Sequence, residues 1–340
     1  MLLQQTRVAQ AVPYFERFTR RFPTLRSLAQ ASQEEVLKVW EGAGYYARAR
    51  HLHQAAVLIA EEQGGRIPST VPELERLPGV GPYIARAIAS QAFGVVVSAL
   101  ESNGLRIVAR WTREVRDVRV PKVRATLEAV LSRELPASRP GAYNEAVMEL
   151  GETICTLRAP RCRECPVSSL CATYRAGVDP ETLPKRVPKP RRPLVRTSVI
   201  VLHHRGGILL QRRPPRGLLG GLWELPGAER RKGELPEQAV RRELREEIGI
   251  TVGKVRFRGV VRHSYSHFHV ELRILEGDVA GSPPPLAGHR RWVSPRELTR
   301  LPLPRATTRV LETIRMAGTR RRPSGERTDR AQRAADRSHP

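Results

Sequence analysis

Apolar residues recur at helical spacing through the first half of the chain and at strand spacing through much of the second. Up to about residue 155 they return every three or four positions. Beyond about residue 194, several short stretches alternate apolar and polar positions instead. The pattern therefore predicts an all-helical domain followed by a domain of mixed α and β structure. Helices are expected near residues 24–30, 33–40, 47–63, 72–77, 84–89, 105–111, 123–135, 141–155, 236–248 and 304–316, and strands near 198–202, 208–211, 254–263, 267–277 and 291–293.

Two stretches of biased composition mark the boundaries of these domains. Proline alternates with lysine and arginine between 179 and 193, which predicts an extended, semi-rigid linker. The segment 317–340 is arginine-rich, polar and aperiodic, which predicts disorder. We therefore expect a helical domain over 1–178, the linker over 179–193 and an α+β domain over 194–316. A chain of 340 residues is long enough for both domains to bury a core.

The chain is strongly basic, with a formal net charge of +25. Such an excess favours a polyanionic partner, because contacts with phosphates release counterions, although a general bias toward arginine would give the same balance. Arg48 and Arg50 follow a pair of tyrosines and could place guanidinium groups against phosphates. No apolar run reaches the roughly 18 residues of a membrane span, and the N-terminus lacks the pattern of a secretory signal. We therefore expect a cytoplasmic, monomeric protein without membrane contact.

A turn rich in glycine and proline, Leu77 to Tyr83, precedes a predicted helix. Gly79 and Gly81 would let the backbone approach a ligand closely, and the free amides of a helix start attract anions. In a basic chain the expected anion is a nucleic-acid phosphate. Glu101 follows at the entrance of the next helix, which suggests an enzyme that grips a DNA backbone and acts on what it grips. A helical hairpin with a capping acid would give the same residues.

Four cysteines follow the last predicted helix of the first domain, in the pattern Cys155-x6-Cys162-x2-Cys165-x5-Cys171. Four thiolates in a short loop that contains prolines can enclose a [4Fe–4S] cluster. Tetrahedral zinc is the main alternative, but it favours two closely spaced pairs, and only one pair here is two residues apart. Disulfides are a third interpretation and would be unusual in so short a segment. The spacing therefore favours an iron–sulfur cluster.

Over nearly its whole length the chain resembles MutY-type adenine DNA glycosylases of the helix-hairpin-helix superfamily. Together the shared motifs are highly specific, whereas the glycine hairpin alone would indicate only the wider superfamily. The resemblance implies removal of adenine paired with 8-oxoguanine or guanine in double-stranded DNA, by hydrolysis of the N-glycosidic bond after the base has been flipped out of the duplex. The shared segments are Leu3-Gln4-Gln5-Thr6, Gly44-Tyr45-Tyr46-Ala47-Arg48-Ala49-Arg50, Leu77-Pro78-Gly79-Val80-Gly81, Tyr143-Asn144-Glu145-Ala146 and the four cysteines.

The chemistry of this reaction requires two acidic groups. One protonates the departing adenine, and the other stabilises the cationic sugar as a carboxylate. By resemblance the second is Glu101, where the family has Asp, and the first is a Glu immediately before the position of Met1. Because the stretch from Met1 to Ala9 has the pattern of a helix interior without a cap, we expect the true start to lie upstream. Without that acid, the chain would be a lesion-binding protein that cleaves poorly.

The resemblance assigns further residues to the site. Tyr83 would line the adenine pocket and help to order the carboxylate of Glu101. Gln5 and Tyr45 would wedge into the base stack beside 8-oxoguanine. Asn144 would hydrogen-bond near the abasic sugar and Glu101. Each of these residues could instead serve as ordinary packing or capping.

Residues 194–312 resemble a Nudix, or MutT-like, domain. In this family such a domain recognises the 8-oxoguanine that lies opposite the target adenine. The matching loop is Tyr265-Ser266-His267, in which Ser266 would hydrogen-bond the oxidised base and Tyr265 would provide a ring for packing. An ordinary strand edge is the alternative interpretation.

The same domain contains most of a Nudix box. Residues 242–250 match its catalytic half, and Glu234 precedes this half at the distance that the box requires. Glu243, Glu246 and Glu247 are spaced to lie on one side of a helix, where they could bind Mg²⁺. The alternatives are therefore a Mg²⁺-dependent nucleotide pyrophosphohydrolase and a charged, solvated helix face. Domains of this kind that are joined to a glycosylase usually serve recognition only.

Overall fold

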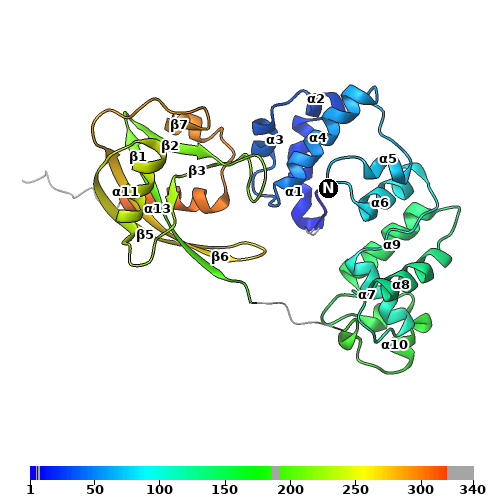
Figure 1. Cartoon of the computed structure of the whole chain (residues 1–340). Helices are drawn as coiled ribbons and strands as arrows, with labels where there is room; N and C mark the ends of the chain where they lie inside the picture. The colour runs from blue at the N-terminus through cyan, green and yellow to red at the C-terminus, as the bar shows by residue number, and fades with distance from the viewer. Residues whose placement is uncertain (5, 7, 186–190, 320–340) are drawn as a thin grey trace, which may run out of the picture. The chain divides into compact units, whose positions relative to one another are not determined.

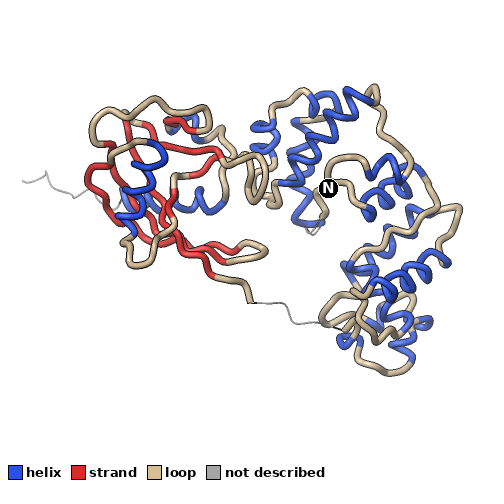
Figure 2. Tube along the Cα trace, viewed as in Figure 1, coloured by secondary structure: helices blue, strands red, loops and turns tan. Residues whose placement is uncertain are grey.

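The chain forms two compact units, Met1–Pro190 and Arg191–Pro340. The strands described all belong to the second unit, and the first is built from helices (Figures 1 and 2). The expected order, an all-helical domain followed by an α+β domain, is therefore confirmed. The computed structural model describes residues 1–4, 6, 8–185 and 191–319, the last three by their backbone alone.

The helices of the first unit begin where the sequence supplies suitable capping residues. They are α1 (Val8–Arg21), α2 (Leu25–Ala29), α3 (Gln33–Val39), α4 (Ala47–Glu62), α5 (Val71–Glu75), α6 (Pro82–Phe93), α7 (Ser102–Thr112), α8 (Pro121–Arg133), α9 (Pro140–Thr153) and α10 (Ala172–Arg175), with 3₁₀ turns at Cys162–Glu164, Ser168–Leu170 and Pro180–Thr182. The Ser32 hydroxyl caps α3 by accepting a hydrogen bond from the Glu35 amide at 3.2 Å. Proline lies in the first turn of α5, α6, α8 and α9, where its missing N–H costs nothing.

Apolar side chains and a close helix contact hold the helical unit together. Leu74 of α5 belongs to one buried cluster, and Ile107 of α7 and Leu131 of α8 belong to another. Helices α6 and α9 approach closely at Gly141, because a Cβ there would lie 2.7 Å from the Ser90 carbonyl oxygen. Any larger residue at Gly141 would push the two helices apart. The candidate catalytic residues therefore sit on a tightly packed frame.

The N-terminal residues form a turn rather than the helix that their sequence predicts. The Gln4 amide donates to the Met1 carbonyl at 3.2 Å, and α1 begins only at Val8. The guanidinium of Arg48 donates hydrogen bonds to carbonyls of this turn, from Nη1 to Met1 at 3.1 Å and to Leu2 at 2.8 Å. Those carbonyls point to a side chain more than forty residues away in sequence, so local periodicity could not reveal the turn.

The segment after residue 178 belongs to the helical unit over its first part. Asp179 caps the 3₁₀ turn that follows it, and Leu183 is buried. The Leu183 carbonyl accepts a hydrogen bond from Arg110 Nε at 3.0 Å. The linker predicted over 179–193 therefore begins later, because one leucine among the prolines anchors the chain to the helices. The centre of that linker, 186–190, lies outside the described residues.

The second unit is a seven-stranded sheet flanked by helices. Its elements are β1 (Leu194–His204), β2 (Gly207–Arg212), β3 (Trp223–Glu224), β4 (Gly227–Ala228), α11 (Pro236–Ile248), β5 (Val252–Ser264), β6 (His269–Val279), β7 (Arg290–Val293), α12 (Pro295–Leu298) and α13 (Arg305–Thr319). The strand order is β3-β2-β1-β6-β5, with β4 paired to β1 and β7 paired to β2. Strands β1 and β6 run parallel, and the other pairs are antiparallel.

Alternation along β1 gives this sheet two apolar faces. Ile200 packs in one buried cluster with Leu244 of α11, whereas Val201 packs in another with Val310 of α13. Helices α11 and α13 therefore cover opposite faces of the sheet, as Figure 1 shows. Helix α13 continues to Thr319, and the remainder of the tail predicted to be disordered, 320–340, lies outside the described residues.

Candidate active site and metal-ligand clusters

The hairpin between α5 and α6 has the geometry of an anion-binding turn. Gly79 has a φ of +74°, and a Cβ there would lie 2.6 Å from the Cβ of His51, so only glycine fits. Gly81 is the N-cap of α6 and supplies no side-chain cap, and the space above Gly81 is open. With Pro82 in the first turn and no acidic residue there, the remaining amides and the helix dipole face an accessible surface.

Glu101 and Tyr83 lie close to one another at the start of α7 and α6. The Glu101 carboxylate caps α7 by accepting a hydrogen bond from the Asn103 amide at 2.6 Å. Burial, followed by the negative charge of Glu101, raises the pKa of Tyr83 to about 12. The Tyr83 hydroxyl therefore stays protonated at neutral pH, and it donates to the Met148 sulfur at 3.5 Å. The structure thus brings together two of the residues that the resemblance places in the site.

Asn144, which the resemblance places near the abasic sugar and Glu101, is buried inside the protein. It is fully buried, and its Nδ2 donates to Ser90 Oγ and to the Val97 carbonyl, both at 2.9 Å. Its Oδ1 accepts from the Ala99 amide at 3.0 Å. Both amide hydrogens are therefore used inside the protein. Asn144 acts on Glu101 only indirectly, by fixing the segment that leads into it.

The four cysteines of the loop after α9 line a single cavity together with Arg110 of α7. All four are free thiols, and burial is the first cause that raises the pKa values of Cys162 and Cys165. Arg110 Nη1 donates to Cys155 Sγ at 3.3 Å, whereas Nη2 of the same side chain is buried without a hydrogen-bond partner. Four soft thiol donors around one cavity match the ligand types of an iron–sulfur cluster. Among the described residues, however, neither these cysteines nor any other three His, Cys, Asp or Glu side chains are arranged to hold a metal ion as they stand.

A chain of hydrogen bonds connects this cysteine loop to Glu101. Arg106 is 7% exposed, and its Nε donates to the Cys155 carbonyl at 2.9 Å. Its Nη2 donates to the Gly151 carbonyl at 2.7 Å, and its Nη1 donates to Asn103 Oδ1 at 2.9 Å. Asn103 is the residue whose amide Glu101 accepts. The sequence reasoning missed this connection, although a charged residue inside the apolar run of α7 is a signal that could have found it.

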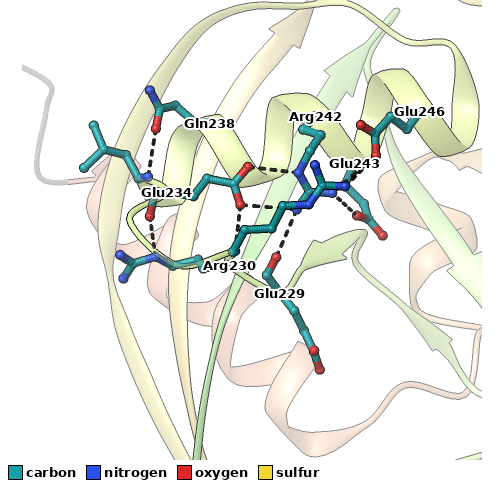
Figure 3. Close-up of polar contacts among 9 residues, drawn as sticks. Glu229, Arg230, Glu234, Gln238, Arg242, Glu243 and Glu246 are labelled. Atoms are coloured by element: carbon teal, nitrogen blue, oxygen red, sulfur yellow. Dashed lines mark hydrogen bonds and ion pairs between the residues drawn. The ribbon is translucent and has the colours of Figure 1, made fainter.

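The second unit carries a cluster of carboxylates around Arg242 of α11 (Figure 3). Arg242 Nε lies 2.9 Å from Glu234 Oε1. Its Nη1 lies 3.1 Å from Glu243 Oε2 and 3.4 Å from Glu246 Oε2. The hydrogen bond from Arg242 is the largest cause that lowers the pKa of Glu234 to about 2. Arg242 of the Nudix box therefore forms ion pairs with these carboxylates, so they are not free to bind a cation.

The remaining carboxylate of the predicted magnesium site, Glu247, faces a different arginine. Glu247 Oε2 lies 3.6 Å from Arg290 Nη2, and both residues line a cavity beside α11 with Glu243. Among the described residues, no group of three or more His, Cys, Asp or Glu side chains is arranged to hold a metal ion. The helical spacing of Glu243, Glu246 and Glu247 is as expected, but their ion pairs with arginines do not fit a Mg²⁺ site as it stands.

The loop predicted to read the oxidised base is the turn between β5 and β6. The Tyr265 amide donates to the Phe268 carbonyl at 2.8 Å, and the two rings lie 5.0 Å apart. Tyr265 packs against the apolar cluster below α13, whereas Ser266 and His267 are exposed at the tip. The turn therefore presents the two polar residues and uses the aromatic one as an anchor.

Comparison with known protein families accounts for both units. Residues 1–134 match the family described as HhH-GPD superfamily base excision DNA repair protein. Residues 197–313 match the NUDIX domain. The chain joins an HhH-GPD DNA-repair domain to a C-terminal NUDIX domain. The combination expected from the sequence motifs is therefore confirmed.

Several relatives of this chain are named adenine DNA glycosylase. The human protein named adenine DNA glycosylase is 32% identical over 349 residues, which cover 87% of this chain and 63% of the relative. A Mycolicibacterium smegmatis protein of the same name is 38% identical over 186 residues, or 55% of this chain and 62% of the relative. The chain thus spans less than two thirds of these relatives. Among solved structures, a thermostable thymine-DNA glycosylase covers 52% of this chain and 81% of its own length, at 24% identity and a TM-score of 0.46.

The HhH-GPD domain differs from the sequence expectation around its paired tyrosines. Tyr45 is 45% exposed, as a residue that contacts DNA should be, but Arg48 and Arg50 are buried and do not present their charges to a phosphate. Gln5, the other predicted wedge, lies outside the described residues. None of the described helices in either domain is both long and apolar enough to cross a membrane.

Proposed function

We propose that this chain is an adenine DNA glycosylase that removes adenine opposite 8-oxoguanine or guanine in double-stranded DNA. The observation that carries the proposal is the Glu101 carboxylate, which is fixed at the start of α7 beside Tyr83 and follows the HhH-GPD hairpin. The names of the relatives over most of the chain support the same reaction. The protein would act as a cytoplasmic monomer.

In this proposal the hairpin binds the DNA backbone and leaves the target nucleotide extruded. The free amides that follow Gly81 would donate hydrogen bonds to a phosphate, and the close contact of Gly79 with His51 fixes the shape of the hairpin. The exposed ring of Tyr45 would wedge into the base stack beside 8-oxoguanine while the adenine is extruded. Extrusion is a physical requirement, because the glycosidic bond of a stacked adenine is shielded by its neighbours.

The chemical step would cleave the N-glycosidic bond and add water to the sugar. Positive charge develops on the sugar as the bond breaks, and the Glu101 carboxylate would stabilise it. One oxygen of that carboxylate is held by the Asn103 amide, which orients the group before substrate arrives. Tyr83, neutral at physiological pH, would pack beside the extruded base without adding a competing charge.

The cysteine loop would hold a [4Fe–4S] cluster through Cys155, Cys162, Cys165 and Cys171. When bound, the cluster would crosslink the loop and supply acceptors for the unsatisfied N–H group of Arg110. The loop would in this way become a rigid support for Arg106 and, through it, for the start of α7.

The NUDIX domain would recognise the base opposite the target rather than hydrolyse a nucleotide. The exposed tip at Ser266 and His267 supports a contact with 8-oxoguanine. The pairing of its Nudix-box carboxylates with arginines weakens the alternative of a Mg²⁺-dependent pyrophosphohydrolase. We derive no step through Mg²⁺ for this reason.

A strand-labelled duplex with adenine opposite 8-oxoguanine, treated with alkali after incubation, tests the proposal. The chain should be assayed both as it stands and with one Glu added before Met1, where the resemblance places the acid that protonates adenine. Replacement Glu101→Gln should lower the rate of alkali-labile site formation about 10²–10³-fold. Glu16→Gln, an exposed glutamate on α1, is the matched control and should leave the rate unchanged. A rate that is equal in the wild type and Glu101→Gln would contradict the proposal.

A further inference from the structure

Arg48 occupies a place where a positive charge needs an explanation. It lies in the first turn of α4, where the helix dipole disfavours a cation, yet it is only 8% exposed. Burial is the largest cause that lowers the pKa of Arg48. Burying a guanidinium is costly unless it is well hydrogen-bonded. Hydrogen bonds from the side chain must therefore offset the free-energy cost of burying it.

Those partners come from two segments that are far apart in sequence. Nη1 donates to the Met1 and Leu2 carbonyls and to that of Gln4. Nη2 donates to the Ala43 carbonyl at 3.2 Å, and further contacts of Nη2 reach Thr6 Oγ1 and the Gly44 carbonyl. Each acceptor found for this guanidinium among the described residues is neutral. One planar fork therefore ties the N-terminal turn to the turn before α4.

Each of the two tied turns displays an exposed apolar side chain. Leu3 is 59% exposed on the first turn, and Tyr45 is 45% exposed on the second. Tyr45 has a φ of +47°, a left-handed conformation that is strained for a non-glycine residue and persists only where its surroundings enforce it. The surroundings here include Arg48, whose guanidinium lies 5.2 Å from the centre of the Tyr45 ring.

The buried ring of Trp40 also contacts the Arg48 guanidinium. The Trp40 ring lies 5.5 Å from the Arg48 guanidinium, on which it provides a cation–π contact. Trp40 Nε1 also donates to the Gly44 carbonyl at 2.9 Å, next to Tyr45 in sequence. Arg48 thus contacts both the exposed Tyr45 ring and the buried core residue beneath it. Lysine could replace its charge but not its flat, multidentate shape.

We propose that Arg48 is a positioning residue that fixes Leu3 and Tyr45 as one rigid apolar wedge against the base stack of a damaged duplex. The inference rests on the proposed function, because the base stack that the wedge contacts belongs to the DNA substrate proposed above. Arg48 itself contacts no DNA in this proposal. It acts by holding two loops, contributed by separate parts of the chain, at a fixed separation before DNA binds.

The test uses the full chain and does not depend on cleavage. 2-Aminopurine is placed beside 8-oxoguanine, so that its fluorescence rises when the protein unstacks it. Arg48→Lys should weaken binding to this duplex about tenfold and reduce the fluorescence rise, while thermal unfolding changes little. Arg20→Lys, an exposed arginine on α1, is the control and should behave as the wild type. Arg48→Met removes the charge as well as the hydrogen bonds and should weaken binding and fluorescence in the same way. If Arg48→Met does not fold, the result for Arg48→Lys alone decides the test.

A double-mutant cycle with Tyr45→Ala separates positioning from general structure. If Arg48 acts through Tyr45, Arg48→Lys should have little further effect on fluorescence once the ring is absent. Additive losses, or a fluorescence rise in Arg48→Lys equal to that of the wild type, would overturn the role of Arg48. A wild-type chain that bound damaged and undamaged duplexes equally would instead overturn the proposed function.

Discussion

Two clusters of candidate metal ligands, one in each domain, are visible as sequence motifs but differ in their surroundings. The cysteine loop of the HhH-GPD domain turns four thiols toward one cavity, with Arg110 as the charged group in its wall. The Nudix-box carboxylates of α11 also share one region, but arginines lie among them. In the first cluster, Cys155 accepts a hydrogen bond from Arg110 and Cys171 donates one to the Arg110 carbonyl. In the second cluster, the carboxylates are held in ion pairs with arginines.

The difference lies in which acceptors the arginine of each cluster binds. Arg110 donates hydrogen bonds to the Leu183 and Thr156 carbonyls, and one further hydrogen bond goes to the sulfur of Cys155. Arg242 directs its donors to the carboxylates of Glu234 and its neighbours. A cation must displace this resident arginine before it can use those oxygens. A ligand motif therefore predicts a metal site only where no side chain of opposite charge is already bound to it.

The largest expected effect comes from the cysteine loop. In Cys165→Ser the four-ligand set is incomplete, so most bound iron and sulfide should be lost and lesion affinity should fall at least about tenfold. Iron and acid-labile sulfide per chain, together with visible absorption, measure the first effect, and DNA titration measures the second. Ser168→Ala changes a non-ligand in the wall of the same cavity and should keep the metal. Full iron content in Cys165→Ser, or zinc in place of iron in the wild type, would contradict this prediction.

The next effect tests whether the cysteine loop supports Glu101. Lysine at Arg106 cannot serve the Cys155 and Gly151 carbonyls and Asn103 Oδ1 at once. Arg106→Lys should therefore lower the single-turnover cleavage rate about 10–100-fold, in the range seen when a supporting contact of a metal site is removed. Iron content should change much less than the rate. Arg133→Lys, on the exposed end of α8, is the control, and an unchanged rate in Arg106→Lys would show that the connection carries no function.

Sequence reasoning succeeded where a residue type has few alternatives. The glycine turn at Gly79 between two helices and the four cysteines around one cavity follow from motif and spacing. The alternation of apolar and polar positions beyond residue 194 likewise predicted strands in the second domain. These features depend on local backbone geometry or on short-range spacing, which a single sequence records directly.

Sequence reasoning failed for polar residues whose partners are distant in sequence. Arg48 lies in a motif that could place guanidinium groups against phosphates, but it is buried against the carbonyls of Met1, Leu2 and Gln4. The resemblance placed Asn144 near the abasic sugar and Glu101, and its side chain hydrogen-bonds inside the protein to Ser90 and to the segment before Glu101. Arginine and asparagine are usually exposed, so their burial can be recognised only once the fold has brought their acceptors to them.

A smaller effect should appear in the titration of the acid cluster. The folded-state pKa of Glu234 lies near 2 instead of its ordinary 4.5, because Arg242 hydrogen-bonds to it. The stabilisation from this pair is therefore fully present above about pH 4.5 and is lost as the pH falls through about 2. In Arg242→Met the midpoint should move back toward the ordinary value. NMR titration of chains with ¹³C-labelled glutamate measures both midpoints, and a wild-type midpoint near 4.5 would mean that the ion pair does not form in solution.

The smallest expected effect is the absence of nucleotide hydrolysis by the NUDIX domain. Since Arg242 and Arg290 already bind the carboxylates of α11, the wild-type chain with Mg²⁺ should not degrade an oxidised nucleoside triphosphate faster than buffer does. Glu246→Gln should then be indistinguishable from the wild type, and phosphate or pyrophosphate release measures both. Arg242→Met sharpens the comparison, because it removes the arginine while keeping all three acids. Turnover by the wild type that disappears in Glu246→Gln would show that Mg²⁺ displaces these arginines readily, and the contrast with the cysteine loop would no longer hold.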